Sequence, residues 1–220
     1  MANCCDTHTA ASSTDSFFSK HSKRYAKRFK KGLLEKEQLL LLEGIRKEGL
    51  SNARVLDIGC GVGQLHLTLL KEGAQAATAV DMAQGMLNNA QRFAESIGVA
   101  DRAAYVQGDF VSVANTLQPA DITMLDKVVC CYEHLDKLLD ASMSKASSVY
   151  ALTHPAENWL IRLSFALMIN VRTLFRAEFR PYWHDWNAMR HNIEQRGFRL
   201  AYQRTTLWWN VLVYRRTATS

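Results

Sequence analysis

The chain has 220 residues, of which 48% are hydrophobic and 22% are charged, and this composition predicts one globular domain with a full core. Its net charge of +6 is concentrated in two basic regions, residues 20–31 and 162–216. Such regions can attract nucleic acid, anionic lipid or acidic small molecules, although a solvated helix face is the favoured interpretation of the first. Five cysteines, four of them in adjacent pairs, argue against a disulfide framework and favour a reducing compartment. Because no apolar signal segment is visible at the N-terminus, we expect a cytoplasmic location.

Two segments precede the main domain. Residues 1–15 are rich in Ser, Thr, Ala and Asn, and we expect them to form a flexible tail. Residues 16–50 are predicted to form an N-terminal helical cap, with a break at Gly32 between two helices. The second of these helices is predicted over residues 33–48.

Strands and helices alternate through the rest of the chain, residues 51–220, which predicts a parallel sheet covered by helices on both faces. The predicted strands are 54–58, 76–81, 104–107, 122–125, 148–153, 198–205 and 208–215. The predicted helices are 64–71, 83–97, 135–143 and 184–196. The last two strands are expected to pair as an antiparallel hairpin.

An unusually apolar segment, residues 157–175, lies inside a region that we expect to act as a lid, residues 155–186. Its apolar core is too short to span a membrane, which takes about 20 residues. A helix packed over the mouth of the active site is the favoured interpretation. A contact with a membrane surface and a pocket for a large apolar substrate are the alternatives.

Three alternate glycines follow the first predicted strand. Residues 55–63 read V-L-D-I-G-C-G-V-G, and glycine has no Cβ and tolerates positive φ, so such a turn brings the backbone close to a ligand. The spacing differs from the G-x-G-x-x-G of dinucleotide-binding folds, and no P-loop lysine pattern is present. The Asp57 carboxylate ahead of the glycines would repel a phosphate and attract an ammonium group. The turn therefore suits a cationic ligand such as S-adenosylmethionine (SAM).

Two more acidic residues mark the ends of the next strands. Asp81 ends the second predicted strand, where an acid can accept hydrogen bonds from both hydroxyls of a ribose. Gly108-Asp109-Phe110 follows the third strand. There Asp109 is expected to accept a hydrogen bond from an adenine amino group, with Phe110 packed near the ring.

Together these motifs resemble the class I SAM-dependent methyltransferases over roughly residues 52–153. The resemblance implies an α/β, Rossmann-like, doubly wound fold with a seven-stranded, mostly parallel sheet, a terminal antiparallel hairpin and an N-terminal helical cap. It also implies an enzyme with SAM as its cofactor. The residues expected at the cofactor are Asp57, Gly59, Cys60, Gly61, Gly63, Asp81, Met82, Gly108, Asp109, Phe110, Asp126 and Lys127, with Tyr25 and Lys31 from the cap.

The resemblance implies that residues 126–134 face the methyl acceptor. His134 is the first candidate for a catalytic base, although it is equally well explained as an exposed histidine at the start of a helix. Tyr132 and His184 are the other candidates. Further residues are expected to contact the substrate, with the two arginines clamping a carboxylate: Cys130, Cys131, His154, Arg176, Arg180 and Tyr182.

The adjacent cysteines allow a second chemistry. Cys130 and Cys131, with Cys4 and Cys5 from the tail, could hold a soft metal or a metalloid, as in arsenite-type methyltransferases. Buried cysteines more often behave as small hydrophobic residues, and no metal site is predicted.

The favoured function is transfer of a methyl group from SAM to an O, N or S atom of a small-molecule acceptor in a lidded pocket. The lid and residues 128–132 are loosely similar to bacterial magnesium-protoporphyrin O-methyltransferases, which makes a tetrapyrrole carboxylate one candidate acceptor. The alternatives are an RNA or protein methyltransferase that uses the basic surfaces, a thiol or metalloid methyltransferase, and a nonenzymatic SAM-binding protein. The lack of an N-P-P-Y or D-P-P-Y segment after the fourth strand counts against a nucleic-acid substrate.

Overall fold

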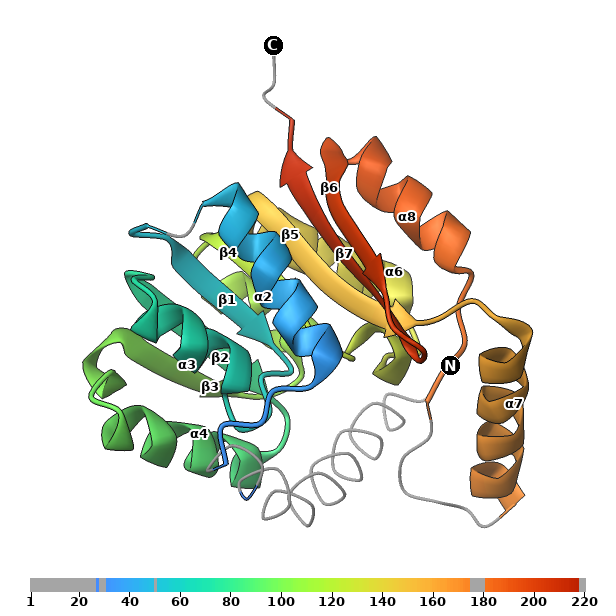
Figure 1. Ribbon diagram of the computed structural model, residues 1–220, viewed down its shortest axis with the longest axis horizontal. Coiled ribbons are helices and arrows are strands. Elements are labelled where there is room, and N and C mark those ends of the chain that lie inside the picture. The colour runs from blue at the N-terminus through green and yellow to red at the C-terminus, as the bar shows by residue number, and fades with distance from the viewer. Residues whose placement is uncertain (1–26, 28–30, 50, 175–180, 218–220) are drawn as a thin grey trace, which may run out of the picture.

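A seven-stranded sheet lies between two layers of helices in the computed structural model of the chain (Figure 1). The structure describes residue 27 and residues 31–49, 51–174 and 181–217, without the side chains of 171–174. The strand order is β3-β2-β1-β4-β5-β7-β6, and β7 runs antiparallel to both of its neighbours, whereas the other pairs are parallel. The predicted fold class, with its terminal antiparallel hairpin, is confirmed. The predicted tail and most of the first cap helix lie outside the described residues.

The elements follow the predicted order along the chain. The strands are β1 (Arg54–Ile58), β2 (Ala76–Asp81), β3 (Ala103–Gln107), β4 (Ala120–Leu125), β5 (Ala146–Pro155), β6 (Phe198–Thr205) and β7 (Trp209–Arg216). The longer helices are α2 (Lys36–Glu48), α3 (Gln64–Lys71), α4 (Gln84–Ser96), α6 (Leu135–Ser144), α7 (Trp159–Leu174) and α8 (Trp186–Gln195). A single helical turn, α5 (Phe110–Val113), follows β3.

Helix α2 begins later than predicted, at Lys36 instead of residue 33. Glu35 is its N-cap in a capping box, in which the backbone N–H of Glu35 donates to Gln38 Oε1 over 3.1 Å. Such a box satisfies amide groups that have no partner within the helix, and it marks where the helix starts. The leucines that precede it continue the apolar pattern but lie outside the helix.

Each face of the sheet has its own hydrophobic core, because successive side chains of a strand point to opposite faces. Val55 packs with α2, α3 and α4 on one face. Leu56 and Ile58 pack with α5, α6 and α8 on the other face. The five strands β1–β5 run parallel, so their C-terminal ends lie together at one edge of the covered sheet. Ligands of open α/β folds bind at this edge.

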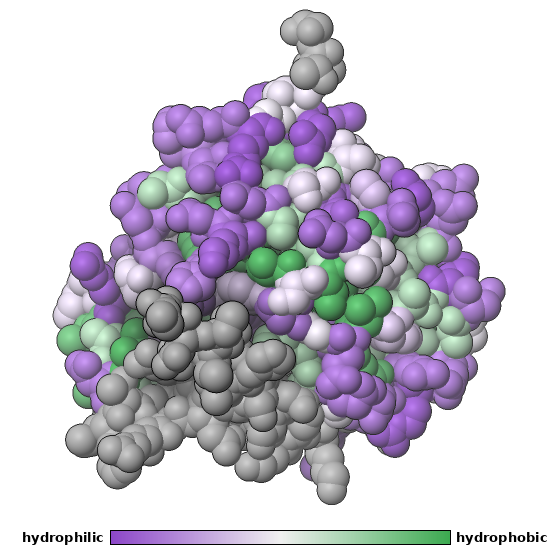
Figure 2. Space-filling model, turned by 180° about the vertical axis from the view of Figure 1, so that it is seen from behind, coloured by the Kyte–Doolittle hydropathy of each residue, from purple (hydrophilic) through white to green (hydrophobic). Residues whose placement is uncertain are grey.

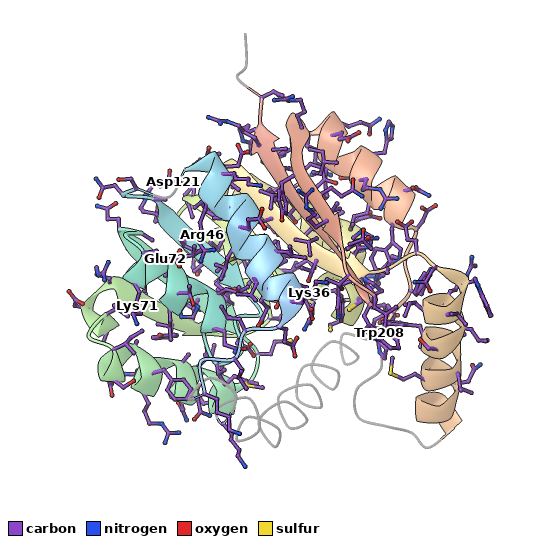
Figure 3. All side chains as sticks on the ribbon, viewed as in Figure 1. Lys36, Arg46, Lys71, Glu72, Asp121 and Trp208 are labelled. Carbon is purple, nitrogen blue, oxygen red and sulfur yellow. The ribbon has the colours of Figure 1, made fainter. Side chains whose placement is uncertain are left out.

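Helix α2 lies directly on the C-terminal hairpin. A Cβ on Gly44 would lie 2.6 Å from Val213 Cγ2 and 2.7 Å from Tyr202 Cδ1, so only glycine allows this close approach. Arg46 also reaches the end of α3, where its Nε and Nη2 donate to the two carboxylate oxygens of Glu72 over 2.8 and 2.6 Å (Figure 3). These contacts fix α2 against the rest of the domain.

Helix α7 projects from the body next to the tip of the β6–β7 hairpin (Figure 1). The Ala156 N–H donates to Trp208 O over 2.9 Å, which ties the start of this segment to the hairpin turn (Figure 3). Trp159 and Trp208 are 73% and 52% exposed, and Leu163 of α7 is 59% exposed. Seen from behind, hydrophobic colour appears at the left edge of the molecule, the side on which α7 lies (Figure 2). Within the part of the chain that is described, no helix combines the length and the apolarity needed to cross a membrane.

Candidate cofactor and active site

The turn between β1 and α3 contains Gly59, Gly61 and Gly63, whose φ angles are +67°, +54° and +87°. A Cβ on Gly59 would lie 2.5 Å from Val128 Cγ2, and one on Gly63 would lie 2.9 Å from the His66 ring. A Cβ on Gly61 would meet no atom within 4 Å. Two of the glycines are therefore required by neighbouring side chains, whereas the open side of Gly61 lets a ligand approach the backbone. This cradle fits a cofactor such as SAM.

Asp57, at the end of β1, has a buried partner that sequence reasoning missed. The side chains of Asp57 and His66 are 2% and 0% exposed, and His66 Nδ1–H donates to Asp57 Oδ2 over 2.7 Å. The Tyr105 hydroxyl lies 3.5 Å from His66 Nε2, and the two rings meet edge to face. His66 is a single polar residue on the inward face of an apolar helix, so its spacing carried no signal.

Asp81, at the end of β2, is held by two backbone amides. Its Oδ2 accepts from Gly61 N–H and its Oδ1 from Ala83 N–H, each over 2.8 Å. These bonds orient the carboxylate next to the glycine turn. The sequence predicts that an acid at this place receives the hydroxyls of a ribose.

Gly108-Asp109-Phe110 lies beside Asp81, because Gly108 N–H donates to Asp81 O over 3.1 Å. Asp109 is the N-cap of α5, and its Oδ2 accepts from both the N–H and the hydroxyl of Ser112. Phe110 is buried in the core beneath the sheet. Met82, half-buried, follows Asp81 directly.

Asp126 follows β4 and is enclosed by polar side chains of other elements. Its Oδ1 accepts from the Thr153 hydroxyl over 2.7 Å and its Oδ2 from Gln38 Nε2 over 2.9 Å. Burial raises its pKa to about 6, although both hydrogen bonds act in the opposite direction. Asp126 thus joins the ends of β4 and β5 to the start of α2.

Lys127 adopts a left-handed backbone conformation with φ +61°. Its Nζ forms ion pairs with Glu35 and with Glu37, the latter over 2.6 Å, and lies 5.2 Å from the centre of the Trp209 ring. The first turn of α2 is therefore anchored over the ends of the strands. Sequence reasoning placed Lys127 near the cofactor but missed these two acids, which read as ordinary surface charges of a helix start.

The segment after α7 returns to the end of β4. Tyr182 N–H donates to Cys130 O over 2.7 Å, and His184 Nε2–H donates to Tyr132 O over 2.8 Å. Burial lowers the pKa of His184, which favours the neutral imidazole. Three of the predicted acceptor-side residues, Tyr132, Tyr182 and His184, are therefore brought together.

An aromatic cluster continues from this contact toward α7. Trp183 meets Phe165 of α7 at 5.4 Å between ring centres and Trp186 at 5.9 Å. These rings pack edge to face against one another and against the core on this face of the sheet. Sequence reasoning assigned no role to these tryptophans.

His134 and His154 are placed differently from this group. His134 is exposed at the N-cap of α6 and its side chain makes no capping bond. His154 is fully buried, donates from Nδ1 to Pro155 O and stacks on Trp186 at 4.9 Å. Burial, together with the nearby charge of Arg190, lowers the pKa of His154 to about 4. A buried neutral histidine in that position is part of the core.

The cysteines within the described residues, Cys60, Cys130 and Cys131, are free thiols. Burial, reinforced by Asp81 and Asp57, raises the pKa of Cys60. A hydrogen bond with Cys131 and burial raise the pKa of Cys130. Among the residues whose placement is described, no group of three or more His, Cys, Asp or Glu side chains is arranged to hold a metal ion.

Five of the residues predicted from the sequence to contact a ligand lie outside the described residues: Tyr25, Arg176, Arg180, Cys4 and Cys5. Lys31 is exposed, and Leu33 O accepts from Gln64 Nε2 over 3.0 Å, which sets the cap segment beside the start of α3.

Comparison with known proteins agrees with this geometry. Residues 55–151 match a family of methyltransferase domains. A ribosomal protein L11 methyltransferase of Shewanella sp. strain W3-18-1 is 37% identical over 84 residues, which are 38% of this chain and 26% of that protein. The chain therefore spans about a quarter of the length of such curated relatives.

Solved structures share the fold over a greater length. Magnesium protoporphyrin IX methyltransferase of Synechocystis PCC 6803, solved with bound SAH, has a TM-score of 0.73 at 20% identity, covering 95% of this chain and 100% of that one. An O-methyltransferase family protein of Burkholderia thailandensis has a TM-score of 0.67 at 14% identity, covering 92% of this chain and 62% of that one. The match over residues 55–151 and the seven-stranded topology thus make this chain similar to methyltransferases, one of which was solved with bound SAH.

Proposed function

We propose that this chain transfers a methyl group from SAM to an O, N or S atom of a small-molecule acceptor, bound between the cofactor and the segment that carries α7. The observation that carries the proposal is the pairing of Tyr182 and His184 with the backbone carbonyls of Cys130 and Tyr132. It lays an aromatic strip over the end of β4, next to the cofactor-binding edge. Such a wall suits an apolar or aromatic acceptor.

The cofactor would be held by Asp57 at its ammonium group and by Asp81 at its ribose, with Gly61 leaving room for it. SAM supplies a methyl carbon that is already activated by the sulfonium, so the protein mainly has to align the acceptor and exclude water. Residues 16–50 are proposed as a helical cap, a role that the anchored start of α2 supports. Residues 155–186 remain assigned as the lid.

His184 is the preferred candidate for a base that removes a proton from the acceptor. Its lowered pKa favours a neutral ring, and donation from Nε2 to Tyr132 O leaves the lone pair on Nδ1. His134 lacks a comparable setting, because its side chain is exposed at the start of α6. We therefore rank His184 ahead of His134.

The acceptor class is suggested by the aromatic cluster and by the fold comparison. The Synechocystis neighbour acts, by its name, on magnesium protoporphyrin IX, a large planar molecule. A tetrapyrrole carboxylate is accordingly one candidate acceptor. The free thiols of Cys60, Cys130 and Cys131 support a reducing, cytoplasmic setting.

Protein methylation is the second candidate, because the curated relatives are named as ribosomal protein L11 methyltransferases. Their likeness spans 26% of their length, so it supports a shared methyltransferase domain more than a shared acceptor.

A screen with isotopically labelled SAM tests these candidates against tetrapyrrole, metabolite, thiol, metalloid, RNA and ribosomal-protein pools. Label is expected in a small aromatic or tetrapyrrole molecule, at a rate insensitive to salt. Label in RNA or protein, with binding that weakens steeply as salt rises, would overturn the proposed acceptor class.

A further inference from the structure

His66, near the start of α3, has a fully buried side chain and has no part in the function proposed above. We propose that His66 is a positioning residue for the methyl donor, which holds the Asp57 carboxylate in place to receive the ammonium group of SAM. This inference rests on SAM binding as proposed above. It concerns a side chain outside the glycine turn itself.

The contact between the two residues is short and dry. His66 Nδ1 lies 2.7 Å from Asp57 Oδ2, and both side chains are almost completely buried. A buried carboxylate without a partner is unfavourable, and a bond from an N–H donor stabilises its charged form. Each carboxylate oxygen can accept more than one hydrogen bond, so pairing with His66 leaves Asp57 able to bind a ligand cation.

Two neighbours restrict the imidazole to this orientation. A Cβ on Gly63 would lie 2.9 Å from His66 Cε1 and 3.0 Å from Nε2, so the third glycine of the turn makes room for the ring. On the other side the Tyr105 hydroxyl lies 3.5 Å from Nε2, and burial raises the pKa of Tyr105, which keeps the phenol neutral. A neutral phenol can donate to Nε2, which leaves the ring proton on Nδ1, facing Asp57.

The glycine motif therefore has two separate tasks. Gly61 leaves space for the ligand, and Gly63 leaves space for the side chain that orients the acid. His66 comes from α3, Asp57 from β1 and Tyr105 from β3, so the ammonium subsite depends on three elements. A substitution at His66 should then alter recognition of the amino-acid end of SAM and leave recognition of adenosine unchanged.

The test compares His66→Leu with His66→Asn, because Leu and Asn have nearly the same shape and only Asn can donate from the Nδ1 position. Calorimetry with SAM, SAH and 5′-methylthioadenosine separates the two ends of the ligand, since 5′-methylthioadenosine lacks the amino-acid end. For His66→Leu we expect SAM and SAH to bind about tenfold more weakly, the effect of losing one charge-assisted interaction, with 5′-methylthioadenosine unaffected. For His66→Asn we expect all three affinities to stay near those of the wild type.

A merely structural role would weaken all three ligands together in His66→Leu, or would affect the Leu and Asn variants alike, and either result overturns the inference. If His66→Leu does not fold, His66→Gln replaces it, because Gln keeps a polar group toward Tyr105 and loses the donor toward Asp57. The inference then requires the same selective loss of SAM and SAH binding. A wild-type protein that binds neither SAM nor SAH would instead overturn the proposed function, whatever the variants do.

Discussion

The backbone N–H of Gly61 donates to Asp81 Oδ2 over 2.8 Å, which joins the middle glycine of the turn to the acid at the end of the neighbouring strand. A second amide, that of Ala83, holds the other carboxylate oxygen. The position of the acid is therefore set by the backbone, and little rearrangement is needed for it to meet a ribose. Preorganisation of this kind lowers the cost of binding.

Replacing Asp81 with Ala is expected to weaken SAM binding by about tenfold to a hundredfold, because charged hydrogen bonds to the ribose hydroxyls are lost. Calorimetric titration measures the change. The matched control is Asp121→Ala, which removes an acid at the other end of the sheet, where Asp121 accepts from Arg54 N–H over 2.8 Å (Figure 3). Affinity that is unchanged in Asp81→Ala, or equally reduced in both variants, would contradict the assignment.

Alanine at Gly61 and at Gly63 should have different effects. At Gly63 the new Cβ would collide with the His66 ring, so we expect a loss of about 2 kcal/mol or more in the free energy of unfolding. At Gly61 the Cβ meets open space, so the cost is the positive φ, about 1 kcal/mol, while SAM binding is lost. Urea unfolding and SAM titration of both variants check this, and equal loss of stability in the two would count against it.

Asp126 should make stability depend on pH. Its pKa is about 6 in the folded protein against an ordinary 3.8, so the folded state binds this proton more tightly than the unfolded state. The resulting stabilisation is complete below about pH 4 and is lost as pH rises through about 6. Asp126→Asn has no carboxyl to titrate and therefore lacks this pH dependence. Between pH 4 and pH 8, its free energy of unfolding should rise by about 2 kcal/mol relative to that of the wild type.

Chemical unfolding at a series of pH values measures that difference. Thr153→Val provides a check, because it removes a hydroxyl that lowers the pKa of Asp126 and should move the transition to higher pH. A difference between Asp126→Asn and the wild type that does not vary with pH would show that the Asp126 carboxyl titrates normally.

Cys60 and Cys130 should resist alkylation in the folded protein. The pKa of Cys60 is raised by burial and by nearby carboxylates. The pKa of Cys130 is raised by its hydrogen bond with Cys131 and by burial. Both thiols therefore stay protonated, and the thiolate is the reactive form. Mass spectrometry after iodoacetamide treatment at neutral pH is expected to find both unmodified until the chain is denatured. Rapid labelling of Cys130, with loss of turnover in Cys130→Ser plus Cys131→Ser, would favour thiol or metalloid chemistry instead.

The placement of the glycine turn and of the acids at the strand ends was largely predictable from the sequence, because local signals carry it. Glycine spacing and acids at strand ends place Asp57, Asp81 and Asp109 without knowledge of distant contacts, and the bounds of β1, α3 and β2 match their predictions. The partners of these residues were not predictable. His66 lies one turn into an apolar helix, and Gln38 comes from a helix 88 positions away from Asp126 in the chain.

The surroundings of the candidate acceptor-side histidines were not predictable, for the same physical reason. The local sequence does not show which of His134 and His154 is buried. His134 is exposed at the start of a helix, whereas His154 is buried against Trp186. Only the return of residues 182–186 to the end of β4 separates His184 from them. That contact joins segments 52 positions apart, and no local pattern records it.

The central claim, that Asp57 and the glycine turn form a SAM site, is tested most directly by titrating SAM into the wild type and Asp57→Asn. Asn keeps the shape of the side chain and an oxygen that accepts from His66 Nδ1–H, and it removes only the negative charge. We expect saturable binding to the wild type and about tenfold or greater weakening in the variant, with 5′-methylthioadenosine bound equally by both. A wild type that does not bind SAM, or a variant that binds it as tightly as the wild type, would contradict the claim.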